Sequence, residues 1–167
     1  MVNWYCAMAL QLSGKDFEEI RDGFKKIDKD NDGAISLSEF KNCLTDGKED
    51  EDEAVDFYMK LYDLNRNGSI EFPEFLEVIA YFRYKKKPNN IQIKQMFRAL
   101  DKNNKGLISA EDIKRFYKIF SSDDLPDETS LNTLIQELDT NGDGEINYSE
   151  FSKNYKKFER HSSNIHM

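Results

Sequence analysis

Four segments of twelve residues carry oxygen-bearing side chains at a fixed spacing, and they span residues 28–39, 63–74, 101–112 and 139–150. We name them loop one to loop four in chain order. Each begins with Asp and has Gly at its sixth position and Ile at its eighth, and their starts lie 35, 38 and 38 residues apart. Carboxylates and amides at positions 1, 3, 5 and 12, with a backbone carbonyl at position 7, supply the oxygen ligands that calcium requires. A single Asp-Gly pair usually marks only a turn, but this repeat favours a divalent-cation site.

The glycine and the isoleucine of each loop have separate structural reasons. A glycine at position 6 permits a backbone turn that a Cβ atom would resist. A β-branched residue at position 8 suits a short strand that pairs with its counterpart in a neighbouring loop. We therefore expect Ile108 of loop three to pair with Ile146 of loop four.

Three of the loops have a complete set of predicted ligands. These ligands are Asp28, Asp30, Asp32, Ala34, Ser36 and Glu39 in loop one, Asp63, Asn65, Asn67, Ser69 and Glu74 in loop two, and Asp139, Asn141, Asp143, Glu145 and Glu150 in loop four. Ala34, Ser69 and Glu145 would contribute backbone carbonyl oxygens. Ser36 would act through a water molecule, and Glu71 can restore charge to loop two. Magnesium, which also prefers oxygen, can compete with calcium for these sites.

Loop three departs from the pattern at two positions. Lys105 stands at position 5, where an oxygen ligand is expected, and its ammonium would repel a cation. Asp112 replaces Glu at position 12 and is one methylene shorter, so it would often offer the metal only one oxygen. Asp101, Asn103 and Asp112 are therefore doubtful ligands. We expect loop three to be empty or weak for calcium and to support loop four structurally.

These loops make the chain resemble the EF-hand superfamily, in particular the four-hand proteins of the calmodulin and troponin C type. The resemblance covers about residues 13–160 and implies an all-α fold of two lobes. Each lobe would be a pair of helix–loop–helix units whose loops are joined by a short antiparallel β link. The expected organisation is an N-terminal extension at 1–12, an N-terminal lobe at 13–84, a linker at 85–90, a C-terminal lobe at 91–160 and a tail at 161–167.

Apolar residues recur at helical spacing on both sides of every loop, as amphipathic helices require. Before the loops, the predicted core residues are Phe17, Ile20, Phe24, Ile27, Val55, Tyr58, Met59, Tyr62, Ile93, Met96, Phe97, Leu100, Leu131, Leu134, Ile135 and Leu138. After the loops, they are Phe40, Cys43, Leu44, Phe75, Val78, Ile79, Phe82, Ile113, Phe116, Tyr117, Phe120, Phe151, Tyr155 and Phe158. Ser13 and Asp16 fit a capped helix start, and Pro88 predicts a break between the lobes.

Composition excludes several classes of protein. The formal net charge of the 167 residues is −8, which disfavours broad binding to nucleic acids or anionic membranes. Two cysteines cannot build a disulfide framework, no apolar run approaches a membrane span, and the first residues do not resemble a secretory signal. We therefore expect a cytoplasmic location, with nuclear access left open. No catalytic motif is recognisable, so we expect no enzymatic activity.

The functional prediction is a regulatory calcium sensor that binds about three calcium ions and changes conformation to engage a protein target. The target would present an amphipathic helix to apolar side chains of the exit helices. One alternative is a calcium buffer that binds ions but barely opens. A remote alternative is a calcium-controlled nucleic-acid binder, whose basic residues would come from 85–87 and from 153–160. The sequence does not predict an oligomeric state.

Overall fold

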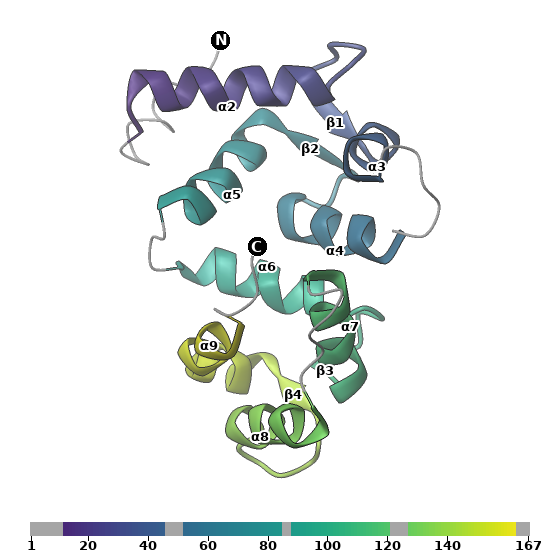
Figure 1. Ribbon diagram of the computed structural model, residues 1–167, viewed down its shortest axis with the longest axis vertical. Coiled ribbons are helices and arrows are strands. Elements are labelled where there is room, and N and C mark those ends of the chain that lie inside the picture. The colour runs from purple at the N-terminus through teal and green to yellow at the C-terminus, as the bar shows by residue number, and fades with distance from the viewer. Residues whose placement is uncertain (1–11, 46–51, 85–87, 121–126, 163–167) are drawn as a thin grey trace. The chain divides into compact units, whose positions relative to one another are not determined.

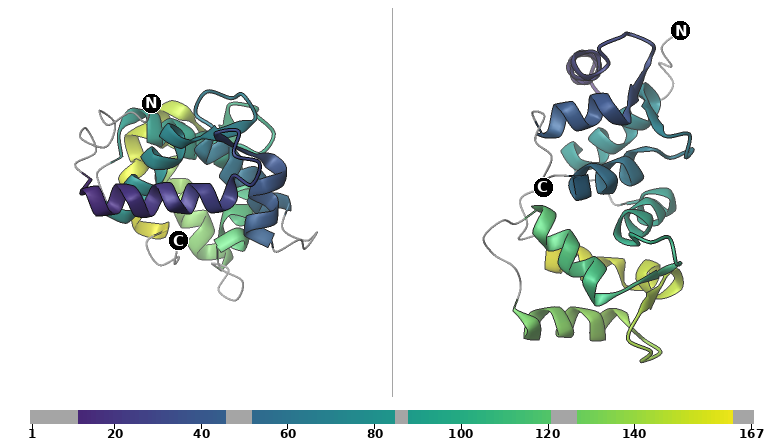
Figure 2. Two further views of the ribbon diagram at one scale, coloured as in Figure 1. Left: turned by 90° about the horizontal axis from the view of Figure 1, so that it is seen from above. Right: turned by 90° about the vertical axis from the view of Figure 1, so that its right-hand side faces the viewer.

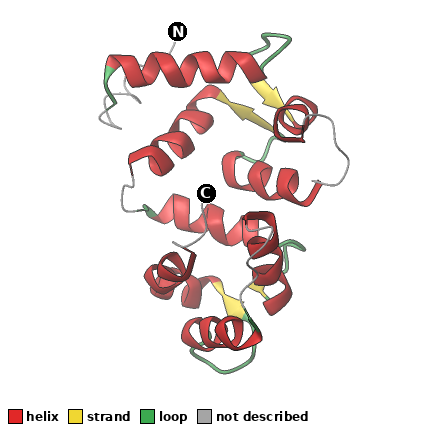
Figure 3. Cartoon of the chain, viewed as in Figure 1, coloured by secondary structure: helices red, strands yellow, loops and turns green. Residues whose placement is uncertain are grey.

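The computed structural model describes residues 12–45, 52–84, 88–120 and 127–162, and helices dominate these residues (Figure 1, Figure 3). In chain order the elements are α2 (Gly14–Ile27), β1 (Ala34–Ser36), α3 (Leu37–Thr45), α4 (Asp52–Tyr62), β2 (Ser69–Glu71), α5 (Phe72–Tyr84), α6 (Asn90–Leu100), β3 (Leu107–Ile108), α7 (Ala110–Phe120), α8 (Glu128–Leu138), β4 (Ile146–Asn147) and α9 (Tyr148–Ser162). The described helices and the two small strand pairs confirm the predicted all-α fold with short β links.

The chain divides into two compact units, residues 1–88 and 89–167. Each unit contains two hands, where a hand is an entering helix, a loop with its strand, and an exit helix (Figure 2). Parts of three predicted segments lie outside the described residues, namely the extension up to residue 11, the linker at 85–87 and the tail from residue 163. The predicted break between the lobes falls on that linker. The structure describes α5 up to Tyr84 and begins α6 at Asn90.

The two loops of each unit are joined by an antiparallel strand pair. In the first unit β1 pairs with β2, and Ile35 lies opposite Ile70. In the second unit β3 pairs with β4, and Ile108 lies opposite Ile146 as predicted. All four isoleucines are at most 1% exposed. The link between the loops is therefore also part of the core of each unit.

Capping side chains set the start of three helices. Ser13 caps α2 in a reciprocal arrangement with Asp16, which confirms the predicted helix start. Asn89 caps α6 in the same way with Gln92, and its side chain accepts the Gln92 N–H at 2.9 Å. Asp127 caps α8 by accepting the Ser130 N–H. These caps satisfy amide groups that the first helical turn leaves without partners.

Most of the predicted core residues are buried, two are exposed, and five are half-buried, namely Ile27, Tyr58, Ile79, Ile93 and Ile135. Cys43 and Leu44 are exposed, so the prediction that they belong to the core is wrong. Both lie in the last turn of α3, beyond Phe40, whose ring packs against Tyr58 and Tyr62 at centroid distances of 6.2 and 5.8 Å. The side chains of Phe82 and Phe120 lie outside the described part of the structure.

Candidate metal-binding loops

All four loops share one backbone turn, which brings their first and sixth positions together. The glycines at position 6 have φ between 79° and 93°, a left-handed conformation that a residue with a Cβ atom adopts with strain. Position 4 is also left-handed in every loop. Each position-6 amide donates to the position-1 carboxylate, and the N···O distances are 3.2 Å to Asp28, 3.0 Å to Asp63, 2.7 Å to Asp101 and 2.8 Å to Asp139. Loop three therefore folds like the others although its ligand set is incomplete.

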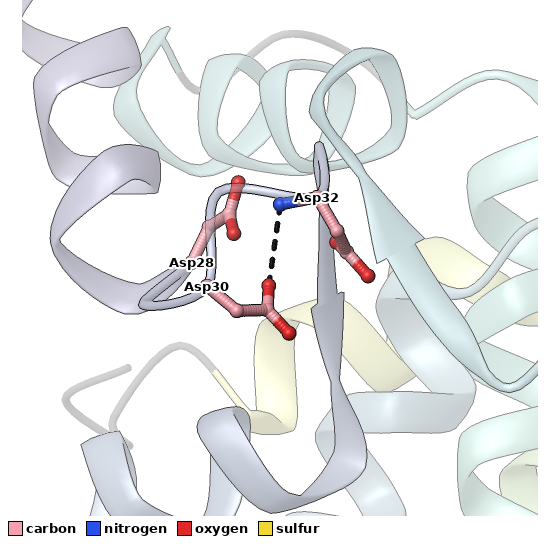
Figure 4. A group of neighbouring side chains, drawn as sticks. All are labelled: Asp28, Asp30 and Asp32. Atoms are coloured by element: carbon pink, nitrogen blue, oxygen red, sulfur yellow. Dashed lines mark hydrogen bonds between the residues drawn. The ribbon is translucent and has the colours of Figure 1, made fainter.

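Three carboxylate side chains lie close together in loop one (Figure 4). Asp28, Asp30 and Asp32 each offer an oxygen, and these oxygens lie within 4.8 Å of one another. The Asp32 N–H donates to Asp30 Oδ1 at 3.2 Å, and the Ala34 N–H donates to Asp32 Oδ1 at 2.9 Å. Asp28 Oδ1 is buried and has no hydrogen-bond partner among the described residues. Carboxylates this close repel one another unless a cation lies between them, so the donor set fits calcium.

The position-12 glutamate of loop one reaches back into the loop from the first turn of α3. Its Oε1 accepts the Lys29 N–H at 2.7 Å and the Asp30 N–H at 3.4 Å. Its Oε2 accepts the Ser36 N–H at 2.9 Å and the Ser36 hydroxyl at 2.7 Å. These bonds, those from Ser36 above all, lower the pKa of Glu39 to about 2. Ser36, predicted to act through water, thus contacts the position-12 ligand directly.

Loop two has the same geometry with less charge at positions 3 and 5. Asn67 Oδ1 accepts both the Ser69 N–H and the Ser69 hydroxyl at 3.0 Å. The amide groups of Asn65 and Asn67 donate to the Glu71 carboxylate, in the case of Asn65 at 2.8 Å. Glu71 was not among the predicted ligands, but from the sequence we expected it to restore charge to loop two. It brings a negative charge beside two neutral side chains.

Glu74 closes loop two from the first turn of α5. It is 6% exposed and accepts the amide N–H groups of Leu64 at 2.9 Å, Asn65 at 3.0 Å and Glu71 at 3.0 Å. Burial raises the pKa of Glu74 above its ordinary value of 4.5, and the nearby Glu71 carboxylate also raises it. A cation in this loop would relieve both effects.

In loop four the hydrogen bonds orient every predicted side-chain ligand. Asn141 Oδ1 accepts the Asp143 N–H, and Asp143 Oδ1 accepts the Glu145 N–H, both at 2.9 Å. Glu150 Oε1 accepts the Asn141 N–H at 3.1 Å. The amide of Gly144 lowers the pKa of Asp139, since it donates to the charged carboxylate.

Glu150 lies in the first turn of α9 and is 5% exposed. Its Oε2 accepts the Asn147 N–H at 3.0 Å, and its Oε1 accepts the N–H and the hydroxyl of Thr140, both at 3.0 Å. These bonds, that from Asn147 first, lower the pKa of Glu150. The contact from the Thr140 hydroxyl was not anticipated from the sequence.

Loop three is closed less tightly than the other loops at its start only, since Asp112 Oδ2 accepts the Ser109 N–H at 2.9 Å and the Ser109 hydroxyl at 2.7 Å, as in loop one. Asp112 Oδ1 accepts the Lys102 N–H at 3.3 Å, whereas the corresponding distances from the position-12 glutamates are 2.7 to 3.0 Å. The Lys105 N–H donates to Asp101 Oδ1 at 3.0 Å, and Lys105 occupies the position at which the other loops have Asp or Asn. Asn103 is exposed. The geometry thus retains the loop's shape but offers calcium a poorer donor set.

Within the described residues, no helix combines the length and the apolar character that crossing a membrane requires.

A family model described as an EF-hand domain pair matches residues 17–80 and again residues 91–156. The chain is 32% identical over 102 residues to "Putative calmodulin-like protein 6" of Oryza sativa subsp. japonica. The aligned region covers 59% of this chain and 60% of that protein. It is 30% identical over 100 residues to "Calcium-dependent protein kinase 16" of the same organism, covering 59% of this chain and 18% of the kinase.

A third relative is "Calcium-binding protein LPS1-alpha" of Lytechinus pictus, 28% identical over 89 residues, or 53% of this chain and 26% of that protein. The matched part of this chain thus spans less than two thirds of the length of each of these three relatives.

Proposed function

The chain belongs to the EF-hand family and is a calmodulin-like calcium-binding protein, and from this premise we propose that it is a sensor that binds three calcium ions, changes conformation and engages a protein target. The ions occupy loops one, two and four. Loop three has a structural role. The observation that carries the proposal is the contrast between three loops closed by a glutamate and one loop closed by an aspartate.

The number of ions follows from the donor sets. Loop one offers four carboxylates, and loops two and four each offer at least two carboxylates with oriented amide oxygens. Loop three offers Asp101 and Asp112 but places Lys105 at position 5. Three ions bring the formal net charge from −8 to −2. Relief of the repulsion between carboxylates favours the bound state, and this free energy is available to shift the conformation.

The conformational change is proposed to act through the position-12 glutamates. Glu39, Glu74 and Glu150 lie in the first turns of α3, α5 and α9, so each connects its loop to an exit helix. An ion that engages both carboxylate oxygens pulls on that helix. In EF-hand sensors such a movement exposes an apolar groove.

The target is proposed to be a protein segment with an amphipathic helix. Large apolar side chains that are already exposed in the described part of the chain support this, and they are Leu37, Leu44, Ile91 and Tyr148. Leu37 and Ile91 are more than half exposed. Burial of such side chains against a partner helix is favourable, at about 1.5–3 kcal/mol for each side chain.

A calcium buffer is the second candidate, and one observation favours it. The position-12 glutamates already lie against the loop amides, and both isoleucine pairs are already formed. Calcium could then bind with little rearrangement of the helices. Sensor and buffer therefore differ in how much apolar surface calcium exposes, not in the ligands they use.

The test is a calcium titration of the full chain at cellular magnesium concentration, with stoichiometry from native mass spectrometry and exposed apolar surface from the fluorescence of a hydrophobic dye. We expect three ions and a rise in dye fluorescence as the sites fill. Three ions with an unchanged dye signal would support the buffer instead. Four comparable sites would contradict the structural role of loop three, and no bound calcium would contradict the proposal as a whole.

A further inference from the structure

We propose that Arg115 is a positioning residue that holds the third hand in shape in place of a metal ion and thereby supports calcium binding in loop four. Arg115 lies in α7, three residues after the last position of loop three. The inference rests on the proposed function of loop four as a calcium site.

The contacts of Arg115 join the two helices of the third hand. Its side chain is buried, with 7% of the residue exposed, and its Nη2 donates to the carbonyl oxygens of Ala99 at 2.8 Å and Leu100 at 3.1 Å. These are the last two residues of the entering helix α6. The last carbonyls of a helix have no intrahelical donor and carry partial negative charge. A guanidinium at that end is therefore held by charge-assisted hydrogen bonds and fixes α7 to α6.

The effect of Arg115 reaches loop four through the strand pair. Loop three begins directly after Leu100, and its residue Leu107 pairs with Asn147 of loop four. The Asn147 N–H donates to Glu150 Oε2 at 3.0 Å, and the Asn147 side chain accepts the Glu150 N–H at 3.1 Å. The residue that pairs with loop three thus also orients the position-12 glutamate of loop four. When the third hand keeps a fixed shape, it holds strand β4 in position, and Asn147 of that strand in turn orients the Glu150 carboxylate.

A buried cation in this arrangement is particular to the third hand, since the comparable bond in the fourth hand, from Lys157 Nζ to the Glu137 carbonyl, is exposed. At the position equivalent to Arg115 they have Asn42, Glu77 and Lys153, of which Asn42 and Lys153 are exposed. Among the residues that the structure describes, Arg115 is the only Lys or Arg that is buried. A buried cation is costly unless it is paired, and this one is in the hand whose loop has the poorest donor set for calcium. The internal cation and the incomplete loop thus occur together.

The test compares three variants of the full chain. Arg115→Met keeps the length of the aliphatic stem but removes the guanidinium, Arg115→Lys keeps a cation with one donor centre, and Lys118→Met is the matched control because Lys118 is an exposed cation on the same helix. Calcium titrations are followed by the amide NMR signals of Gly144 for loop four and Gly33 for loop one. Far-UV circular dichroism verifies that each variant is folded.

We expect Arg115→Met to weaken calcium binding at loop four about tenfold and to leave loop one unchanged, as suits a coupling within one unit. Arg115→Lys should recover part of this loss, and Lys118→Met should match the unmodified chain. Unchanged affinity of loop four in a folded Arg115→Met variant would overturn the inference. If Arg115→Met does not fold, Arg115→Lys decides: a partial loss of calcium affinity confined to loop four supports the inference, and an unchanged affinity overturns it. Failure of loop four to bind calcium in the unmodified chain would instead overturn the proposed function of that loop.

Discussion

The N-terminal and C-terminal units share one plan but differ in what completes each hand. In the first unit both loops end in glutamate, and the paired strands are three residues long. In the second unit one loop ends in aspartate, and the paired strands are two residues long. In the second unit, two cationic side chains donate to carbonyl oxygens at the ends of entering helices. Arg115 donates to the carbonyls of Ala99 and Leu100, and Lys157 donates to the carbonyl of Glu137 at 3.0 Å. The shape of a hand and its ligand set are thus separable properties.

The largest effect expected is the loss of a site within the second unit. Glu150→Gln removes one carboxylate oxygen from loop four, so calcium affinity there should fall by about a hundredfold or more. The matched change Asp112→Asn in loop three should leave the stoichiometry of the chain unchanged. Isothermal titration calorimetry on both variants measures this. A loss of one ion in Asp112→Asn would show that the two loops of this unit are alike.

The next effect is the gain of a site in loop three. The double variant Lys105→Asp with Asp112→Glu restores an oxygen at position 5 and a carboxylate long enough to offer two oxygens at position 12. We expect a fourth ion, with a dissociation constant on the order of 10⁻⁷–10⁻⁵ M if the site acts like those of sensors. Native mass spectrometry counts the ions. A chain that still binds three ions would contradict the prediction that the ligand set keeps loop three empty.

Calcium should stabilise the two units unequally and therefore slow hydrogen exchange more in one unit than in the other. At about 100 times the dissociation constant each bound ion stabilises the folded state by about 2.7 kcal/mol, so a unit with two ions gains about twice as much as a unit with one. Hydrogen exchange with mass spectrometry, with calcium and with a chelator, resolves the units within the full chain. We expect the larger gain in protection in α2 and α4 and the smaller gain in α6 and α8. Equal gains would contradict the difference between the units.

The smallest effect lies in the acid titration of the two position-12 glutamates of the first unit, without calcium. Hydrogen bonds lower the pKa of Glu39 to about 2, whereas burial raises that of Glu74 above 4.5. The contribution of Glu39 to the free energy of unfolding is therefore complete above about pH 4.5, and it is lost as the pH falls toward 2. The Glu74 contribution has the opposite sign and is lost as the pH rises through its folded pKa.

Carbon-13 NMR of the side-chain carboxyl groups measures both pKa values. Glu39→Gln serves as the control, because it removes the low titration and leaves that of Glu74. If both carboxyl groups titrated near 4.5, the contacts of Glu39 with the loop amides would not persist in solution.

Local patterns in the sequence predicted much of the fold and the loops. The repeat located the turns, and the isoleucine at position 8 predicted the pairing of Ile108 with Ile146, which is confirmed. Helical periodicity located most of the core but failed for Cys43 and Leu44, because burial at a helix end depends on which neighbour reaches it. The fully buried Phe57 lay outside the predicted stripe. Arg115 could not be recognised either, since its partners are backbone oxygens fifteen and sixteen residues away.

The isoleucine pairs have a consequence for the steepness of the calcium response. Because Ile35 and Ile70 join two loops that both have full ligand sets, filling one loop orders the strand of the other, and we expect positive cooperativity in the first unit. Its Hill coefficient should lie between about one and about two, the limit for two coupled sites. The pair of Ile108 and Ile146 joins loop four to a loop that we expect to remain empty, so the second unit should saturate hyperbolically. One chain would then respond to calcium with a threshold in one half and a gradual rise in the other.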